Sequence, residues 1–390
     1  MSRVDPYDFH AAALPSETIG AIDRFWSHFS DHIEALDSFW TDASSDADPV
    51  DIMSALHDVS PDLMWEFGSS DRRHKVVITA EWRDDLRPLA RAILRRAPQF
   101  ERFEITDARD PVPVAEIAAT YQARFREDLL LTGLDASVGT DARIAVIGYG
   151  SADTQTLTDQ VLYFASLCLG EQDERDWMGY IDIEADNSKR QGLMSRLGRP
   201  KVEPMELAPA TQSLIAAISL SKEDRPTLPY SQIGLDAPVS VFMKPPTGFH
   251  EDHVRSDLLT YSASDKRFAQ AVFQGDRFAS RCHSAHDEWF VCLRVPNLDG
   301  ALWDTSDRGD IEDAAHEVLA RNGLGGLVGG GTGTEACYID VALTDVPQGL
   351  AVLAAGLRNI RGLDRAEVLF LDVGLTGHAH PFLGATPMSQ

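Results

Sequence analysis

Apolar residues recur at helical spacing near the N-terminus, and strand-like runs follow them. Residues 16–40, SETIGAIDRFWSHFSDHIEALDSFW, carry their large apolar side chains three or four positions apart, which predicts one amphipathic helix. Residues 63–68 and 74–82 predict two strands. A helix with one apolar face is predicted over 85–98 and a third strand over 100–108.

The same order of elements recurs in the next segment of the chain. Residues 128–134 and 142–150 predict strands, 156–170 a helix that ends at Gly170, and 178–185 another strand. Helices on one face of a mixed or antiparallel sheet would accommodate both copies of this order.

The last hundred residues predict the order strand, helix, strand, strand, helix, strand. The predicted strands are 288–295, 325–329, 336–343 and 366–373, and the predicted helices are 310–323 and 344–357. This order is typical of a ferredoxin-like plait, which we expect over about residues 288–374.

Together these patterns predict an α+β fold class. It would contain two or three plait-like modules with helices on one face of mixed or antiparallel sheets. The expected domains are an N-terminal amphipathic helix at 1–49, an α+β domain at 50–187, a linker with a helix at 188–235, and a C-terminal α+β domain at 236–390.

A glycine-rich run, GLGGLVGGGTGTEACYIDV, occupies residues 323–341. A phosphate-binding loop opens a helix and is completed by Lys and Ser or Thr, whereas this run leads into a strand and no Lys follows. We therefore expect the glycines to form a hairpin turn between the second and third strands of the plait.

The formal net charge of −26 narrows the classes of partner. Such a charge repels the phosphates of nucleic acids and anionic lipid headgroups, so neither is an expected partner. It favours a basic protein partner, and solubility alone also explains it.

The cysteines and the N-terminal sequence indicate the cellular compartment in which the protein is expected. Cys168, Cys282, Cys292 and Cys337 show no CxxC spacing, so the sequence indicates no disulfide framework or zinc knuckle. No signal-peptide pattern and no apolar run long enough to cross a bilayer are present in the sequence. We expect a cytoplasmic protein.

Three histidine pairs are the candidate metal ligands. They are His250 and His253, His283 and His286, and His378 and His380. None has a recognised ligand spacing, so we expect loop histidines and no cofactor. A zinc or iron site built from the first two pairs is the alternative.

One basic cluster stands out in the acidic chain. The first three members, Arg72, Arg73 and Lys75, lie at the start of a predicted strand. The other three lie four positions apart on the helix predicted over 85–98: Arg87, Arg91 and Arg95. An anion or an acidic peptide could bind there, and the alternative is a solvated face neutralised by the protein's own carboxylates.

Alternation in two predicted strands places Arg294, Tyr338 and Asp340 on one sheet face. The first and third strands of a plait are neighbours, so we expect these side chains to project together from the face without helices. They would form a binding surface or a buried contact with the preceding domain.

Three segments resemble bacterial domain-of-unknown-function and immunity-protein-like families. They are APQFERFEIT, LCLGEQDERDWMGYIDIE and GGLVGGGTGTEACYIDVALTD. The resemblance implies paired α+β modules in an acidic cytoplasmic protein, and it provides no active site to carry over to this chain.

The leading hypothesis is therefore a non-catalytic binding protein, of immunity type or regulatory, that recognises a basic protein partner. A hydrolase or metal-dependent enzyme with a site built from the C-terminal histidines is one alternative. A structural or scaffolding subunit is the other.

Overall fold

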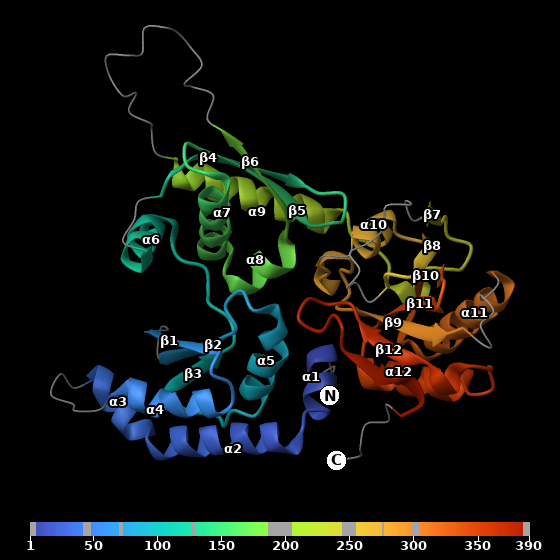
Figure 1. Ribbon diagram of the computed structural model, residues 1–390, viewed down its shortest axis with the longest axis horizontal. Coiled ribbons are helices and arrows are strands. Elements are labelled where there is room, and N and C mark those ends of the chain that lie inside the picture. Colours follow the sequence, from blue (N-terminus) through green and yellow to red (C-terminus); the bar gives the residue numbers. More distant parts are fainter. Residues whose placement is uncertain are drawn as a thin grey trace, which may run out of the picture. The chain divides into compact units, whose positions relative to one another are not determined.

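The computed structural model describes residues 5–41, 48–69, 73–125, 129–185, 205–243, 255–274, 277–297 and 305–384. They confirm the α+β class, with helices and three sheets (Figure 1). The chain divides into two compact units, Met1–Arg109 and Asp110–Gln390. This division lies inside the segment 50–187 that we expected to be one domain, because the two copies of the repeated element order form separate sheets.

The first unit packs helices against a three-stranded sheet. Its elements are α1 (Pro6–Ala12), α2 (Ser16–Asp31), α3 (Ile33–Thr41), α4 (Pro49–Met53), β1 (Met64–Ser69), β2 (His74–Thr79), α5 (Arg87–Arg95) and β3 (Phe103–Thr106). β1 and β2 are antiparallel, and β2 and β3 are parallel. Aromatic side chains of α2 fill the core, where the Trp26 indole N–H also donates to the carbonyl of Ile93 at 2.9 Å.

The prediction of a single helix over 16–40 is wrong. His32, with φ −110° and ψ 8°, separates α2 from α3, and its N–H donates to the carbonyl of Phe29. Helical periodicity continues across this residue because both helices bury apolar side chains, so the pattern alone does not reveal the break.

The second unit begins with a smaller sheet and its helices. The elements are α6 (Ile117–Phe125), β4 (Leu131–Val138), β5 (Ile144–Gly150), α7 (Thr154–Leu169), α8 (Glu171–Trp177), β6 (Met178–Ala185) and α9 (Leu207–Glu223). β4 and β5 are antiparallel, and β5 and β6 are parallel. Asp153 caps α7 by accepting the N–H of Thr156, and the absence of side chains at Gly148 and Gly150 leaves room for Val161 and Leu157 of α7.

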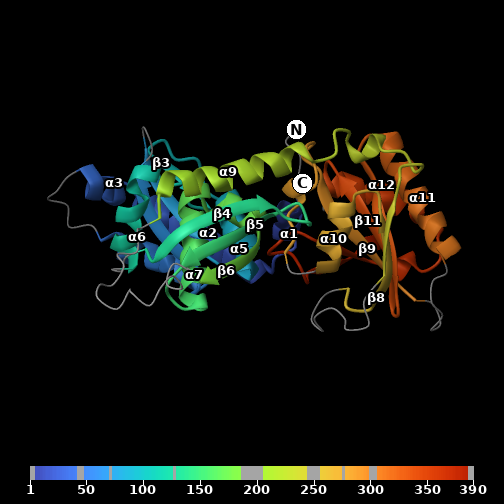
Figure 2. The same ribbon diagram turned by 90° about the horizontal axis from the view of Figure 1, so that it is seen from above.

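Helix α9 belongs to this core, although its residues were expected in a linker. It buries Leu214 and Ile218 and runs beside β4 (Figure 2). Its Ser213 hydroxyl accepts the N–H of Ala136 at 2.9 Å, so a helix satisfies a backbone donor of this edge strand. The expected linker residues 188–204 lie outside the described residues.

The rest of the second unit is built on a seven-stranded sheet. Its elements are β7 (Ser240–Met243), β8 (Leu258–Ala263), α10 (Lys266–Gln274), β9 (Trp289–Pro296), α11 (Thr305–Asn322), β10 (Gly325–Gly333), β11 (Ala336–Leu343), α12 (Val346–Leu357), β12 (Glu367–Phe370) and β13 (Ala379–Pro381). The strand order is β13-β12-β9-β11-β10-β8-β7, and all its pairs are antiparallel.

Helices cover both faces of this sheet, which corrects the expectation that they lie on one face. Leu343 of β11 contacts Gly349 of α12, and α11 packs beside α12. On the opposite face, Phe268 and Phe273 of α10 pack against Phe290 and Phe242. The β7-β8-α10 segment, which the sequence indicated only weakly, supplies this second layer.

Strand β10 begins at Gly325, as predicted, but it continues beyond the predicted 325–329 to Gly333. The glycines expected in the hairpin turn therefore belong to the strand, and the turn lies at Thr334 and Glu335. The lack of side chains at Gly329 and Gly331 leaves space on one face of the strand. The Tyr261 ring of β8 lies over Gly329 and Gly331 and reaches Asp340 of β11, to which its hydroxyl donates. Glycine at these two positions allows the Tyr261 ring to approach the strand closely, because any side chain on this face would occupy the position of the ring.

On the other face of β10 the glycine at position 330 also leaves space. Gly330 lies directly under the Glu312 carboxylate of α11. Glu312 pairs with the Arg308 guanidinium at 2.9 Å, and Arg308 also donates to the Thr332 hydroxyl at 3.0 Å. The absence of a side chain at Gly330 therefore lets the Glu312 carboxylate of α11 come close to the sheet.

We expect Gly331→Ala to destabilise the protein. The new Cβ would lie 2.5 Å from a Leu258 methyl carbon and 2.6 Å from the Thr260 carbonyl oxygen, so the free energy of unfolding should fall by about 1–3 kcal/mol. Gly309→Ala in α11, where no atom lies within 4 Å of the new Cβ, should raise it by about 0.5–1 kcal/mol. Urea denaturation of both variants checks the pair, and equal effects would contradict the packing role of β10.

Candidate functional site

Two arginines of the predicted basic cluster, Arg91 and Arg95, pair with carboxylates of the first unit. Arg91 pairs with Asp107 at 3.1 Å, and Arg87 donates to the carbonyl of the same residue. Arg95 pairs with Asp8 at 2.7 Å and with Asp5 at 3.3 Å. These contacts favour the neutralised face over an anion site, and Arg72 lies outside the described residues.

Arg294, Tyr338 and Asp340 lie on one face of the seven-stranded sheet. Arg294 of β9 is directly opposite Tyr338 of β11, and Asp340 is two residues further along β11. Within the described residues, α10 and residues 255–257 cover this face. Arg294 remains partly accessible and pairs with Glu367 at 3.1 Å.

Asp340 has a buried partner that the sequence did not indicate. Arg255 donates to both oxygens of Asp340 at 2.9 and 2.6 Å, and both side chains are at most 1% exposed. The Tyr261 hydroxyl donates to the same carboxylate. Burial raises the pKa of Tyr261 well above its usual range, and the negative charge of Asp340 acts in the same direction.

A second buried tyrosine reinforces the same face. Asp257 accepts the Tyr338 hydroxyl and the N–H groups of Glu335 and Ala336, so it closes the β10–β11 turn. The Arg255 guanidinium lies 5.5 Å from the centre of the Tyr338 ring. This network satisfies the Asp340 carboxylate and the hydroxyls of Tyr261 and Tyr338, and it exposes no ligand-binding group at Asp340.

We expect Asp340→Ala and Arg255→Ala each to lower the free energy of unfolding by about 3–5 kcal/mol, because each leaves a buried charge unpaired. Arg321→Ala is the control, since Arg321 forms an exposed pair with Glu317; it should change stability by about 0.5 kcal/mol or less. Guanidinium denaturation followed by circular dichroism makes the measurement. A loss below about 1 kcal/mol for both buried variants would contradict the network's role.

The histidine pairs do not form a metal site in the described part of the chain. No group of three or more His, Cys, Asp or Glu there could hold an ion. His283 is buried against Phe278, whereas His286 contacts the carbonyl of Thr227 at 3.1 Å. His380 of β13 packs against Phe370 of β12. His250 and His253 lie outside the described residues.

His283 is a buried neutral imidazole. Burial lowers its pKa from 6.5 to about 3, and the positive charges of Arg267 and Arg143 act in the same direction. Its ring stacks on Phe278 with 4.7 Å between centroids. The neutral imidazole contributes to core packing. Protonating it would require a charge in the core without the solvation that water provides.

This burial predicts a pH-dependent loss of stability. Above pH 6.5, His283 is neutral in both states; below it, the unfolded chain takes up a proton that the folded chain does not. The free energy of unfolding should therefore fall between about pH 6.5 and 3, by up to about 1.4 kcal/mol per pH unit. His283→Phe, which keeps the stacking, should show a smaller loss in urea titrations at pH 7, 5.5 and 4. Equal losses in both proteins would contradict the assignment.

The four cysteines are free and buried. Burial raises the pKa of Cys168 to about 11 and that of Cys337 to about 12, and it raises those of Cys282 and Cys292 well above 9. Near neutral pH these thiols stay protonated, so they are packing groups and not nucleophiles.

The small sheet of the second unit has an acidic open face, which we call the acidic sheet face. Its members are Asp135, Ser137, Ile147, Tyr149, Tyr180, Asp182 and Glu184. Tyr180 is 68% exposed, and the three carboxylates are exposed. No Lys, Arg or His occurs within β4, β5 or β6.

Strand alternation generates the acidic sheet face. In β6 the residues at 180, 182 and 184 point away from α7, while their neighbours turn inward. Tyr149 donates to Asp135 at 3.1 Å, and this hydrogen bond raises the pKa of Tyr149. The alternation in YIDIE was visible in the sequence, and the acidic positions on one side were the signal that sequence reasoning missed.

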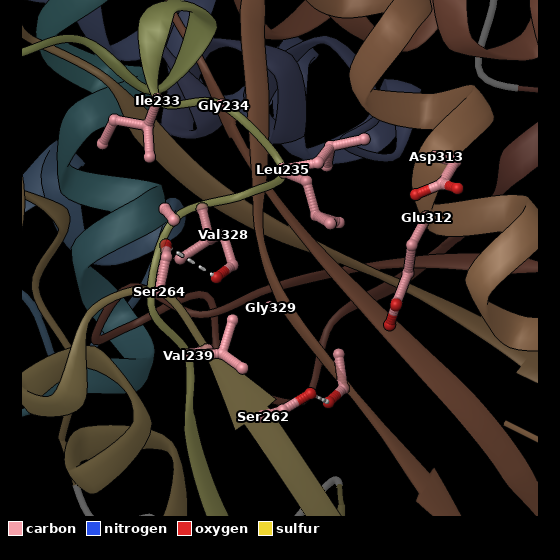
Figure 3. Close-up of a pocket in the computed structure, with 14 residues that line it drawn as sticks. Ile233, Gly234, Leu235, Val239, Ser262, Ser264, Glu312, Asp313, Val328 and Gly329 are labelled. Carbon is pink, nitrogen blue, oxygen red and sulfur yellow. Dashed lines mark hydrogen bonds between the residues drawn. The ribbon is translucent and has the colours of Figure 1, made fainter.

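A pocket of about 240 Å³ lies over β8 and β10 (Figure 3). The Glu312 and Asp313 carboxylates of α11 line one side, and Leu235 and Val239 line the other. Burial raises the pKa of Glu312 above its usual range, and the Arg308 guanidinium opposes this shift.

The hydroxyl groups in this pocket are already engaged. Ser264 donates to the carbonyl of Val328 at 3.1 Å, and Ser262 lies 3.5 Å from the carbonyl of Gly330. The pocket therefore offers carboxylate acceptors and apolar surface rather than an activated nucleophile.

Comparison with known proteins gives no functional assignment. No protein-family model, no curated protein and no solved structure matches the chain. The resemblance to immunity-protein-like families stays a prediction. Within the described residues, none of the helices combines the length and the apolar character that crossing a lipid bilayer would require.

Proposed function

We propose that the protein is a non-catalytic binding protein, of immunity type or regulatory, that recognises a basic protein partner. The acidic sheet face carries this proposal. It combines exposed carboxylates with tyrosines on a sheet face that is open in the described part of the chain, and its strands contain no basic residue.

Physical complementarity supports a protein partner. Tyrosine rings provide contact area at low cost in side-chain entropy, and carboxylates attract Lys and Arg over several ångströms. The formal net charge of −26 adds a long-range field of the same sign. A basic protein surface would meet both the short-range and the long-range requirement.

The chemistry of the other candidate residues favours binding over nucleophilic catalysis. The cysteine thiols are buried with raised pKa values, and the pKa of His283 is lowered by burial. The pocket serines donate to or lie near backbone carbonyls. None of these groups is placed as an accessible nucleophile with a neighbouring base.

We also infer a ferredoxin-like plait in the seven-stranded sheet. The elements β9, α11, β10, β11, α12 and β12 follow one another along the chain, and their strands lie in the order β12-β9-β11-β10. On this interpretation β7, β8 and β13 extend the plait. A cytoplasmic location accords with free, buried cysteines.

Charge removal at the acidic sheet face tests the proposal. We expect the full-length protein to capture a basic protein from a lysate of its host, and Asp135→Asn/Asp182→Asn/Glu184→Gln to lose that capture. With the captured protein purified, the triple variant should lower the association rate at least tenfold, because local attraction accelerates encounter.

A second triple variant controls for net charge. Glu116→Gln/Asp310→Asn/Asp364→Asn removes the same charge from exposed positions outside the acidic sheet face. It should keep the capture and most of the association rate. Equal binding by the two triple variants, or a captured partner that is acidic, would overturn the proposal.

A further inference from the structure

The acidic sheet face has an apolar centre between two charged margins. In the register of the strands, Asp135 of β4, Ile147 of β5 and Asp182 of β6 form one row across the sheet. In the next row Tyr149 of β5 lies beside Glu184 of β6. Ile147 and Tyr149 are half-buried, whereas the three carboxylates are exposed. The charges therefore lie on the two outer strands, and apolar surface lies between them.

The ring of Tyr149 extends the apolar centre toward β4. Gly133 lies opposite Tyr149, and a Cβ at Gly133 would come 3.3 Å from Cδ2 of the ring. Glycine therefore lets the ring lie close over β4, where its hydroxyl donates to Asp135 at 3.1 Å. Helices α7 and α9 pack on the opposite face and fix the sheet. An apolar strip, formed by Ile147 and the Tyr149 ring, thus lies between the charged margins.

The width of this face matches one α-helix. Adjacent strands lie about 4.8 Å apart, so the outer strands β4 and β6 are separated by about 10 Å. An α-helix with its side chains is about 10–12 Å across. A helix that lies along β5 would therefore place its apolar side chains over Ile147 and Tyr149, and its two flanks over the carboxylates of β4 and β6.

The chemistry of the face favours a helix over an extended segment. The apolar strip offers little to the backbone of an extended segment, whose N–H and C=O groups would lose water without gaining partners. A helix satisfies these groups internally. The carboxylates require cations, and Asp182 and Glu184 lie about 7 Å apart along β6, a spacing that two basic side chains one helical turn apart can meet.

We infer that the acidic sheet face binds an amphipathic helix of the partner, with Lys or Arg on both flanks of an apolar stripe and two of these cations on the flank that faces β6. This inference rests on the proposed function, because it names the element of the basic partner that the face recognises. The apolar stripe supplies contact area at helical spacing. The unequal charge of the two margins fixes the direction of the helix, because only one direction places the flank with two cations over β6.

A library of helical scaffolds supplies the probe. A small helix-bundle domain with one randomised helix surface is displayed on phage and selected on the full-length protein, and binders that the variant Asp135→Asn/Asp182→Asn/Glu184→Gln retains are removed. We expect the remaining binders to carry an apolar stripe with basic residues on both flanks. A library without any binder that this triple variant weakens would contradict the inference.

Double-mutant cycles on the tightest binder then assign its flanks. Asp135→Asn should weaken binding about fivefold or more, and by less than about twofold once the basic residues of one flank are replaced by Gln. Asp182→Asn/Glu184→Gln should couple in the same way to the other flank. The variant Glu116→Gln/Asp310→Asn/Asp364→Asn is the control and should leave the affinity within about twofold. Coupling of both margins to the same flank would overturn the inference.

The chain's own basic residues require a further variant. Several follow β6 in the sequence, and Lys189→Gln/Arg190→Gln/Arg196→Gln/Arg199→Gln/Lys201→Gln removes their charge. At physiological salt, where long-range effects are screened, this full-length variant should bind the helix within about threefold of the native chain. A larger gain in affinity would mean that the chain itself competes for the face, and it would overturn the inference.

The results also separate this inference from the proposed function. A basic host protein whose capture the acidic-face triple variant abolishes, together with a library that yields no helix binder, would overturn the inference alone. Helix binders that depend on the three carboxylates, together with a host capture that does not, would support the helix and overturn the proposed function.

Discussion

The ion pair between Arg255 and Asp340 is the contact on which the second unit's large sheet depends. Both side chains are buried, and the guanidinium donates to both carboxylate oxygens. A buried pair of this kind is costly to desolvate and is maintained only when the remaining polar groups are also satisfied. Tyr261 satisfies part of that requirement from β8, and Arg255 itself fixes the segment that leads into β8.

This constraint explains the composition of β10. The strand lies between Tyr261 and Asp340, so any side chain at Gly329 or Gly331 would block the hydrogen bond across it. On the opposite face the lack of a side chain at Gly330 admits Glu312. A strand of glycines packs weakly by itself, and the network above it and α11 below it supply the contacts that its own residues cannot. Gly329 and Gly330 also line the pocket beside Glu312, where they contribute no side chain that would fill it.

Local patterns predicted much of this fold, and long-range contacts account for what they missed. Alternation in β9 and β11 placed Arg294, Tyr338 and Asp340 on one face, since side-chain direction depends only on sequence spacing. The partner of Asp340 lies 85 residues away in a segment without periodicity, so no local signal identified Arg255. Glycine is compatible with turns and with strands under close approach, and only the position of Tyr261 distinguishes them. Likewise, the pairing of Arg91 and Arg95 with distant carboxylates could not be read from their spacing.

The acidic sheet face would attract a partner through a force that salt screens. The attraction between its exposed carboxylates and a basic partner is Coulombic, and it weakens as the Debye length falls to about 8 Å at physiological ionic strength. The exposed ring of Tyr180 on the same face adds apolar contact area, which salt screens little. Salt should therefore change the rate at which a partner associates with this face more than the rate at which it dissociates.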